Sequence, residues 1–269
     1  MNKPTEFKKE SNAFDFLEKY YTVLGHEFTI ILAICCYIPG NYSKLAGKLF
    51  KEHLGYLLNT NKSQEFGKDI KLSTLPETKQ QEIINFVKKA RDAVYKCAGN
   101  TGLPLILVML GELKEVAGTE IWSKLPTKQV IPSLEPDEPN NNTGISSTEH
   151  SKRYRVGREY FSEVYGHVGK YNFLAMIFYE KLVGRIRELH PNLEYVVMES
   201  IYGDLMSDNT VFSKEETELI TVGVISHLNT PVQTYSHVRG AGRVGASEES
   251  IKATVELAKE ILETKNNSC

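Results

Sequence analysis

Cysteine is scarce in this sequence of 269 residues, and its few copies form no recognisable pair. Cys35 and Cys36 are adjacent inside an apolar run, Cys97 is isolated, and Cys269 is the last residue. Because no CxxC motif is present, the ligands of a zinc site and the redox pair of a thioredoxin-type site are both missing. The pattern excludes a disulfide scaffold and is typical of a reducing intracellular compartment.

An excess of either charge is also missing. The chain has 32 Lys and Arg residues against 34 Asp and Glu residues, which gives a formal net charge of −2. Proteins that bind nucleic acids usually carry a basic surplus or a basic stripe. Here Lys and Arg are interleaved with Glu, as on solvated helix faces, and we expect no nucleic-acid partner.

Long apolar runs and targeting signals are missing as well. The longest apolar run, Phe28–Ile38, is about half of a membrane span and ends at Pro39-Gly40. The first twelve residues contain no apolar stretch of the secretory kind, and the C-terminal Asn-Ser-Cys is not a Ser-Lys-Leu peroxisomal address. We therefore expect an intracellular protein with no membrane partner, cytoplasmic in the first place, with mitochondrial and peroxisomal locations left open.

Helical periodicity is abundant. Apolar residues recur with the 3.6-residue spacing of helices, whereas the alternating patterns of strands are nearly absent. Ser213 with Glu216 forms a capping box, and Ser247 places Glu248 and Glu249 at the positive end of a helix. The sequence predicts an all-α fold, with helices at about 13–37, 43–58, 76–98, 103–117, 172–189, 193–206, 214–228, 232–244 and 248–263.

Residues 124–151 separate this helical pattern into two halves. The segment is rich in proline, asparagine, glycine, serine and threonine, a composition typical of an exposed linker. The sequence therefore predicts an N-terminal module, 1–123, and a C-terminal module, 152–269.

The two modules share a weak internal repeat. Each contains a helix, a turn with proline (Gly102–Pro104 or Asn229–Pro231) and a second helix. Aligning the prolines places Leu110 opposite His237, so the first copy lacks the second copy's chemistry. We expect a degenerate N-terminal module that packs against the C-terminal one as an intramolecular pseudo-dimer.

Four short motifs follow one another within Pro191–Leu262. They are Tyr202-Gly203-Asp204, Thr217-Glu218-Leu219-Ile220-Thr221-Val222, His237-Val238-Arg239-Gly240-Ala241 and Val244-Gly245. In order and spacing this segment resembles the carboxymuconolactone decarboxylase and alkylhydroperoxidase D (AhpD) superfamily, and Arg158–Gly166 resembles the opening of that superfamily's modules. The resemblance implies an AhpD-like helical bundle and a homo-oligomer, because such relatives form rings of subunits. Apolar helices such as Phe28–Ile38 could serve that association.

The AhpD-like branch of the superfamily carries a CxxCxxxH motif with a Glu twelve residues before the first Cys. Aligned on His237, the two Cys positions fall on Thr230 and Gln233, while the Glu position falls on Glu218. A thiol peroxidase needs a thiolate and usually a resolving partner. AhpD-like peroxidase chemistry is therefore disfavoured at this site, although recruitment of Cys97 through the fold stays open.

The decarboxylase branch fits the residues present, because its chemistry needs no thiol, metal or organic cofactor. The resemblance implies a cofactor-independent lyase acting on a small carboxylated or lactone-like substrate. His237 would transfer the proton, since imidazole is suited to this near neutral pH, and Glu218 would orient the imidazole or raise its pKa. Arg239 would hold a substrate carboxylate, with Gln233, Thr230 and Tyr202 as further substrate-binding candidates.

Each of these residues also has a plainer interpretation, in which the chain is a non-catalytic scaffold that keeps the fold. His237 could pack within the core, and Glu218 could favour a helix N-terminus. Arg239 could join two helices, and Tyr202-Gly203-Asp204 could be architectural. A helix carrying Glu218 is apolar nearly all round and so is expected to be buried, which requires a partner for its carboxylate.

Two further patterns are set aside. Gly240–Gly245 matches GxGxxG, but no βαβ unit surrounds it, so close packing and a helix C-cap at Gly245 explain it better than a dinucleotide site. No histidine forms a His-x₃-His or Glu-x-x-His pair, so no metal site is expected.

Overall fold

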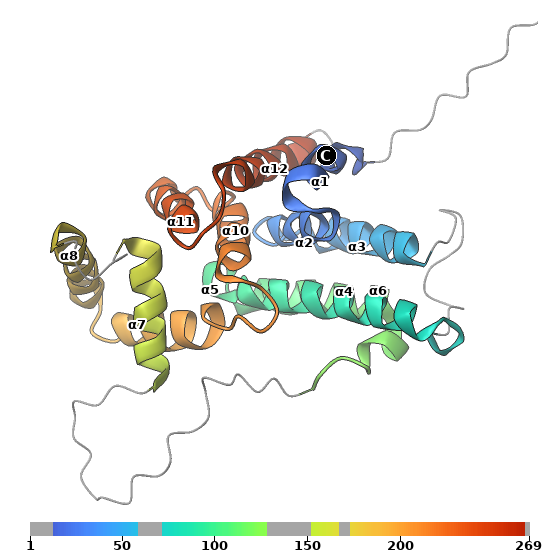
Figure 1. Ribbon diagram of the computed structural model, residues 1–269, viewed down its shortest axis with the longest axis horizontal. Helices are drawn as coiled ribbons and strands as arrows, with labels where there is room; N and C mark the ends of the chain where they lie inside the picture. The colour runs from blue at the N-terminus through green and yellow to red at the C-terminus, as the bar shows by residue number, and fades with distance from the viewer. Residues whose placement is uncertain (1–12, 59–71, 128–151, 167–172, 267–269) are drawn as a thin grey trace, which may run out of the picture.

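The structure, a computed structural model, describes residues 13–58, 72–127, 152–166 and 173–266, with the backbone alone for 173–179 and 265–266. Across these ranges the chain is all α and contains no strand (Figure 1). The first half comprises the 3-10 helices η1 (Asp15–Tyr20) and η2 (Leu72–Thr74) and the helices α1 (Tyr21–Leu24), α2 (His26–Cys36), α3 (Ser43–Leu57), α4 (Glu77–Lys96), α5 (Ala98–Thr101) and α6 (Leu103–Trp122). The second half comprises α7 (Lys152–Tyr165), α8 (Phe173–Leu189), α9 (Leu193–Tyr195), the π-helix η4 (Val196–Met206), α10 (Lys214–Ile225), α11 (Pro231–Arg243) and α12 (Glu248–Asn266).

The marked helix starts are confirmed. Ser213 Oγ accepts the Glu216 amide at 3.2 Å, and a Glu216 side-chain oxygen accepts the Ser213 amide at 2.9 Å, which completes the capping box of α10. Ser247 Oγ accepts the Ser250 amide at 3.1 Å at the start of α12. Gly245 follows the end of α11 with φ +114°, a conformation that glycine adopts without strain.

The expectation of one helix over 13–37 is wrong. The chain forms η1 and α1, breaks at Gly25, and begins again as α2. Gly25 has φ +79° and ψ 147°, which no α-helix accommodates. The helix α7 was not predicted at all, and α6 continues to Trp122 through a kink at Gly118.

One hydrophobic core runs through both halves of the chain. Its centre is α2, which contacts α3 and α4 from the first half and α10 and α12 from the second. Ile220 and Leu257 of the second half lie in the same core as Ile34 and Phe86 of the first. Residues Ile30–Ile38 are themselves buried there. The expected use of Phe28–Ile38 in self-association is therefore wrong for this stretch, because its apolar side chains are already covered.

The predicted linker begins inside the packed part of the chain. Leu125 is buried in the core, and Arg91 Nη1 donates to the Pro126 carbonyl at 3.0 Å. Residues 128–151, the rest of the predicted linker, lie outside the described residues. None of the described helices is both long and apolar enough to cross a membrane.

A second, more aromatic cluster lies where α7 crosses η4, at one end of the molecule in Figure 1. The crossing is close because both helices present glycine. A Cβ on Gly157 would lie 1.7 Å from the Met198 carbonyl oxygen, and one on Gly203 would lie 2.4 Å from that of Arg153. This contact sets how deeply α7 seats against η4, and α7 in turn carries side chains of the candidate site.

Gly157→Ala should destabilise the protein by about 3 kcal/mol, because the added methyl overlaps backbone atoms that cannot move aside locally. Gly111→Ala is the matched control. No atom lies within 4 Å of the position its Cβ would take, so alanine should raise helix stability by about 1 kcal/mol. Denaturant unfolding of both variants measures the effect, and equal stabilities would contradict this account of the crossing.

Candidate functional site

The centre of the site is a buried pair formed by His237 on α11 and Glu218 on α10. The two helices form a hairpin whose turn ends at Asn229, with φ +53°, and Pro231 opens α11 at the position where proline fits a helix. Glu218 has no exposed surface and His237 is 5% exposed. The distance from His237 Nδ1 to Glu218 Oε2 is 2.8 Å. The structure thus brings the two predicted catalytic residues into direct contact.

The ring of His237 is held from both sides. A carboxylate oxygen only accepts, so Nδ1–H donates to Glu218, and Nε2 of the neutral ring is left as an acceptor. The Tyr165 hydroxyl on α7 lies 3.0 Å from Nε2 and fills that position. Tyr202 on η4 donates to the Tyr165 hydroxyl at 3.4 Å. A chain of four polar groups therefore runs from η4 through α7 and α11 to α10.

Both tyrosines of this chain keep their protons near neutral pH. Burial raises the pKa of Tyr165 to about 12, and the nearby Glu218 carboxylate acts in the same direction. Burial also raises the pKa of Tyr202 well above its usual range, with Tyr165 and Glu218 contributing. Tyr165 consequently acts as a hydrogen-bond donor toward the imidazole, and Tyr202 as a donor toward the Tyr165 hydroxyl, rather than as phenolates.

The second oxygen of Glu218 is the unusual feature of the site. Among the described residues Glu218 Oε1 is buried and has no hydrogen-bond partner, and the same holds for the Tyr160 hydroxyl. Burial and then the Glu218 carboxylate raise the pKa of Tyr160, which places that ring within the field of the carboxylate. Buried polar atoms are rarely left unsatisfied, so this side of Glu218 is a position suited to a polar ligand atom.

Close approach of α7 to the pair depends on Gly240. A Cβ there would lie 2.7 Å from Val164 Cγ1 and 3.5 Å from Glu218 Oε2. Arg243 Nη1 donates to the Val164 carbonyl at 2.6 Å and fastens α11 to α7 one turn further on. Close packing, predicted for this glycine-containing segment, is thus confirmed at Gly240.

The remaining predicted residues divide into two groups. Tyr202 joins the site through Tyr165. Arg239 and Gln233 are exposed, and Arg239 Nη1 donates to the Tyr235 hydroxyl at 3.3 Å instead of turning toward His237. Thr230 is the N-cap residue of α11, where its carbonyl accepts the Thr234 amide. The side-chain hydrogen bonds of His237 go to Glu218 and Tyr165, so substrate binding by these three residues stays a prediction.

Sequence reasoning missed Tyr165 and Tyr160 as site residues. Both lie in Arg158–Gly166, the segment that resembles the opening of the superfamily's modules. No motif of fixed spacing links this segment with His237, so the sequence gives no sign that the two lie close together. Their approach depends on the α7–α11 contact, which is a tertiary feature.

The pair is enclosed rather than open. Neither His237 nor Glu218 lines the pockets of about 490, 290 and 190 Å³ that described residues form. The smallest lies beside α10 at Leu219 and Gly245.

The side-chain hydrogen bonds of His237 do not involve a thiol. Cys35, Cys36 and Cys97 are buried, and burial raises the pKa of Cys35 and Cys36. Cys97 Sγ donates to the Ala93 carbonyl at 3.1 Å. Cys269 is outside the described residues, and within them no group of three or more His, Cys, Asp or Glu side chains is arranged to hold a metal ion.

Comparison with known proteins finds a distant relative in yeast. The chain is 22% identical to "Peroxisomal protein 2" of Saccharomyces cerevisiae over 176 residues, which cover 63% of this chain and 59% of that protein. The match therefore spans about three fifths of the relative's length. No family model matches the chain, and no solved structure matches it.

The buried pair should show strong energetic coupling. His237→Leu alone leaves the Glu218 carboxylate buried without its partner and should cost about 3–5 kcal/mol of unfolding free energy. His237→Leu combined with Glu218→Leu should be more stable than His237→Leu alone, because the stranded charge is removed. Denaturant unfolding of the complete mutant cycle measures the coupling. Simple addition of the two single effects would show that the residues are energetically independent.

Proposed function

We propose that this chain is a carboxymuconolactone decarboxylase-like enzyme, a cofactor-independent lyase that acts by His/Glu acid–base chemistry on a small carboxylated or lactone-like substrate. The observation that supports this most directly is the buried hydrogen bond between His237 and Glu218. An imidazole whose tautomer and orientation are fixed by a carboxylate is a recurrent arrangement for proton transfer.

The proposed reaction needs only groups that this chain supplies. The bond between the substrate's carboxylate and its ring carbon breaks, carbon dioxide leaves, and the electron pair passes into the unsaturated lactone. His237 takes up a proton from solvent at Nε2 when Tyr165 moves aside, and the resulting imidazolium delivers that proton to the carbon and returns to the neutral ring. Glu218 stabilises the charged ring through Nδ1, and burial excludes water that would otherwise compete for the proton.

Tyr165 determines access in this proposal. Its hydroxyl occupies the Nε2 position that the reacting carbon must approach, so substrate entry requires the Tyr165 side chain to move aside. Because the Tyr202 hydroxyl donates a hydrogen bond to the Tyr165 hydroxyl, Tyr202 would move together with Tyr165 or lose that bond. Arg239 would bind a substrate carboxylate only after turning away from Tyr235, its partner in the structure.

A structural role for the same residues is the second candidate. The specific observation in its favour is the closure of the site, where Tyr165 caps a histidine that is 5% exposed. AhpD-like peroxidase chemistry is disfavoured more strongly, because the Cys35 and Cys36 thiols are buried with raised pKa values and no CxxC is present.

Location and assembly remain proposals. The name of the yeast relative favours the peroxisomal option over the cytoplasmic one. Self-association, expected from the superfamily resemblance, would use a surface other than α2. One candidate is the apolar surface of α6 that the exposed side chains of Leu103, Leu107 and Val108 form.

Activity is tested with a panel of unsaturated lactone carboxylates that includes carboxymuconolactone. In deuterated water the wild-type protein should release carbon dioxide and place deuterium on the product carbon. His237→Gln should lower kcat/KM by about 100-fold or more, since it removes the proton donor. Glu218→Gln should lower it less, because the imidazole remains.

The matched control is His190→Gln, which changes an exposed histidine whose Nδ1 accepts the Asn192 amide. Its kcat/KM should equal that of the wild type. Full turnover by His237→Gln, or no release and no deuterium incorporation by the wild type across the panel, would leave the structural role as the better explanation.

A further inference from the structure

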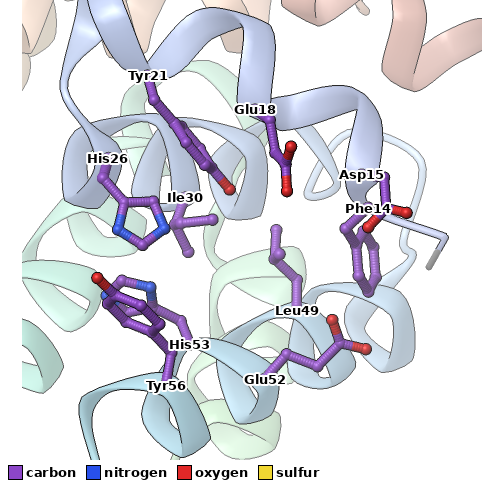
Figure 2. A pocket seen from close by; sticks show the side chains of 10 residues that line it. All are labelled: Phe14, Asp15, Glu18, Tyr21, His26, Ile30, Leu49, Glu52, His53 and Tyr56. Carbon is purple, nitrogen blue, oxygen red and sulfur yellow. The ribbon is translucent and has the colours of Figure 1, made fainter. Parts of the chain in front are cut away.

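A second candidate site is a pocket in the first half of the chain, which neither His237 nor Glu218 lines. It has a volume of about 490 Å³ and is lined by residues of η1, α1, α2 and α3 and by Phe14, which precedes η1 (Figure 2). We call it the N-terminal pocket. Its lining residues are Phe14, Asp15, Glu18, Tyr21, His26, Ile30, Leu49, Glu52, His53 and Tyr56.

The ionised groups that line the N-terminal pocket are all acidic. Asp15 and Glu18 project from η1 and Glu52 from α3, and Figure 2 shows these carboxylates on one side of the pocket. They are close enough to Tyr21 that, after burial, Glu18, Asp15 and Glu52 each raise the pKa of its hydroxyl. The Lys48 ammonium lies at the edge of the pocket, 5.7 Å from the centre of the Phe14 ring.

The opposite side of the pocket is a wall of rings. His26 lies 4.3 Å from Tyr21, 4.9 Å from His53 and 4.8 Å from Tyr56, measured between ring centroids. Burial lowers the pKa of His53 to about 3 and also lowers that of His26. Both imidazoles are therefore uncharged near neutral pH, and the wall does not repel a cation. Tyrosine faces attract cations through their π-systems.

An unsatisfied buried acceptor lies in this wall. His53 is 4% exposed, and its Nε2 has no hydrogen-bond partner among the described residues. In the tautomer that carries its hydrogen on Nδ1, this nitrogen accepts a hydrogen bond from an N–H or O–H donor. Ile30 and Leu49 give the pocket an apolar floor, and Leu49 lies between the carboxylates and the rings in Figure 2.

We propose that the N-terminal pocket binds an aliphatic polyamine, with its ammonium groups at the Asp15, Glu18 and Glu52 carboxylates and one N–H donated to His53. The methylene stem would lie on Ile30 and Leu49. Within the described residues the carboxylates do not converge on a point where a metal ion could be held. Separated carboxylates with an apolar floor instead match a ligand whose positive charges are spread along a hydrocarbon chain.

Isothermal titration calorimetry of the full chain with spermidine at low ionic strength tests the proposal. Spermidine should bind in a 1:1 ratio and more tightly than either Mg²⁺ or choline, which carry charge without the chain of amines. Added salt should weaken binding, because the attraction is electrostatic. The imidazole proton signals of His26 and His53 should shift on binding, which locates the ligand.

Two variants separate the parts of the site. Glu18→Gln combined with Glu52→Gln preserves shape and should weaken binding by about 10-fold or more. His53→Phe preserves a ring but removes the acceptor, and should weaken binding by about 5-fold. Glu188→Gln on α8 is the control for loss of an exposed carboxylate, and its affinity should equal that of the wild type. Unchanged thermal midpoints verify that each variant is folded.

Two outcomes would overturn the proposal. One is spermidine binding no tighter than Mg²⁺, which would show that general charge attraction is all that the surface offers. The other is equal weakening by Glu188→Gln and by the Glu18→Gln/Glu52→Gln variant, which would place the bound cation elsewhere.

Discussion

The hydrogen bond between His237 Nδ1 and Glu218 Oε2 is the constraint on which the second half of this structure depends. A carboxylate with no exposed surface is costly unless a donor satisfies it. The α10–α11 hairpin supplies that donor from within one local unit, whereas the far side of the imidazole is supplied by α7. Gly240 makes this possible, because any side chain there would separate α7 from the pair. The same close approach brings the Tyr165 hydroxyl to Nε2.

The first half of the chain holds the elements that carry the site. Its α2 contacts α10 in the common core and so holds the helix that carries Glu218. A second link is Lys96 at the end of α4, whose ammonium donates to the Leu205 carbonyl at 3.0 Å and the Asp208 carbonyl at 2.8 Å. Burial lowers the pKa of Lys96 to about 8. These contacts fasten the end of η4, and thereby Tyr202, to the first half.

The sequence predicts the all-α fold and the α10–α11 hairpin well, because local signals determine both. The capping box at Ser213 and the proline at 231 fix the helix starts, and nineteen residues of spacing between Glu218 and His237 fit a helix, a turn and two turns of the next helix. The break at Gly25 was missed because a glycine inside an apolar pattern also fits a continuous helix. The role of Tyr165 could not be predicted, since it depends on how α7 crosses η4 at Gly157 and Gly203. Arg239 is exposed because it lies on the solvent-facing side of α11, and the sequence motif alone does not show which side of the helix faces solvent.

The state of the His237 ring tests the central claim most directly. Nitrogen-15 NMR of the imidazole distinguishes a protonated Nδ1 from a protonated Nε2. At neutral pH the structure requires a hydrogen on Nδ1 that exchanges slowly with solvent, because Glu218 holds it and water is excluded. Tyr165→Phe should change the Nε2 resonance and leave that of Nδ1 nearly unchanged. A neutral ring protonated on Nε2, or an Nδ1 hydrogen that exchanges as fast as in free histidine, would contradict the buried pair.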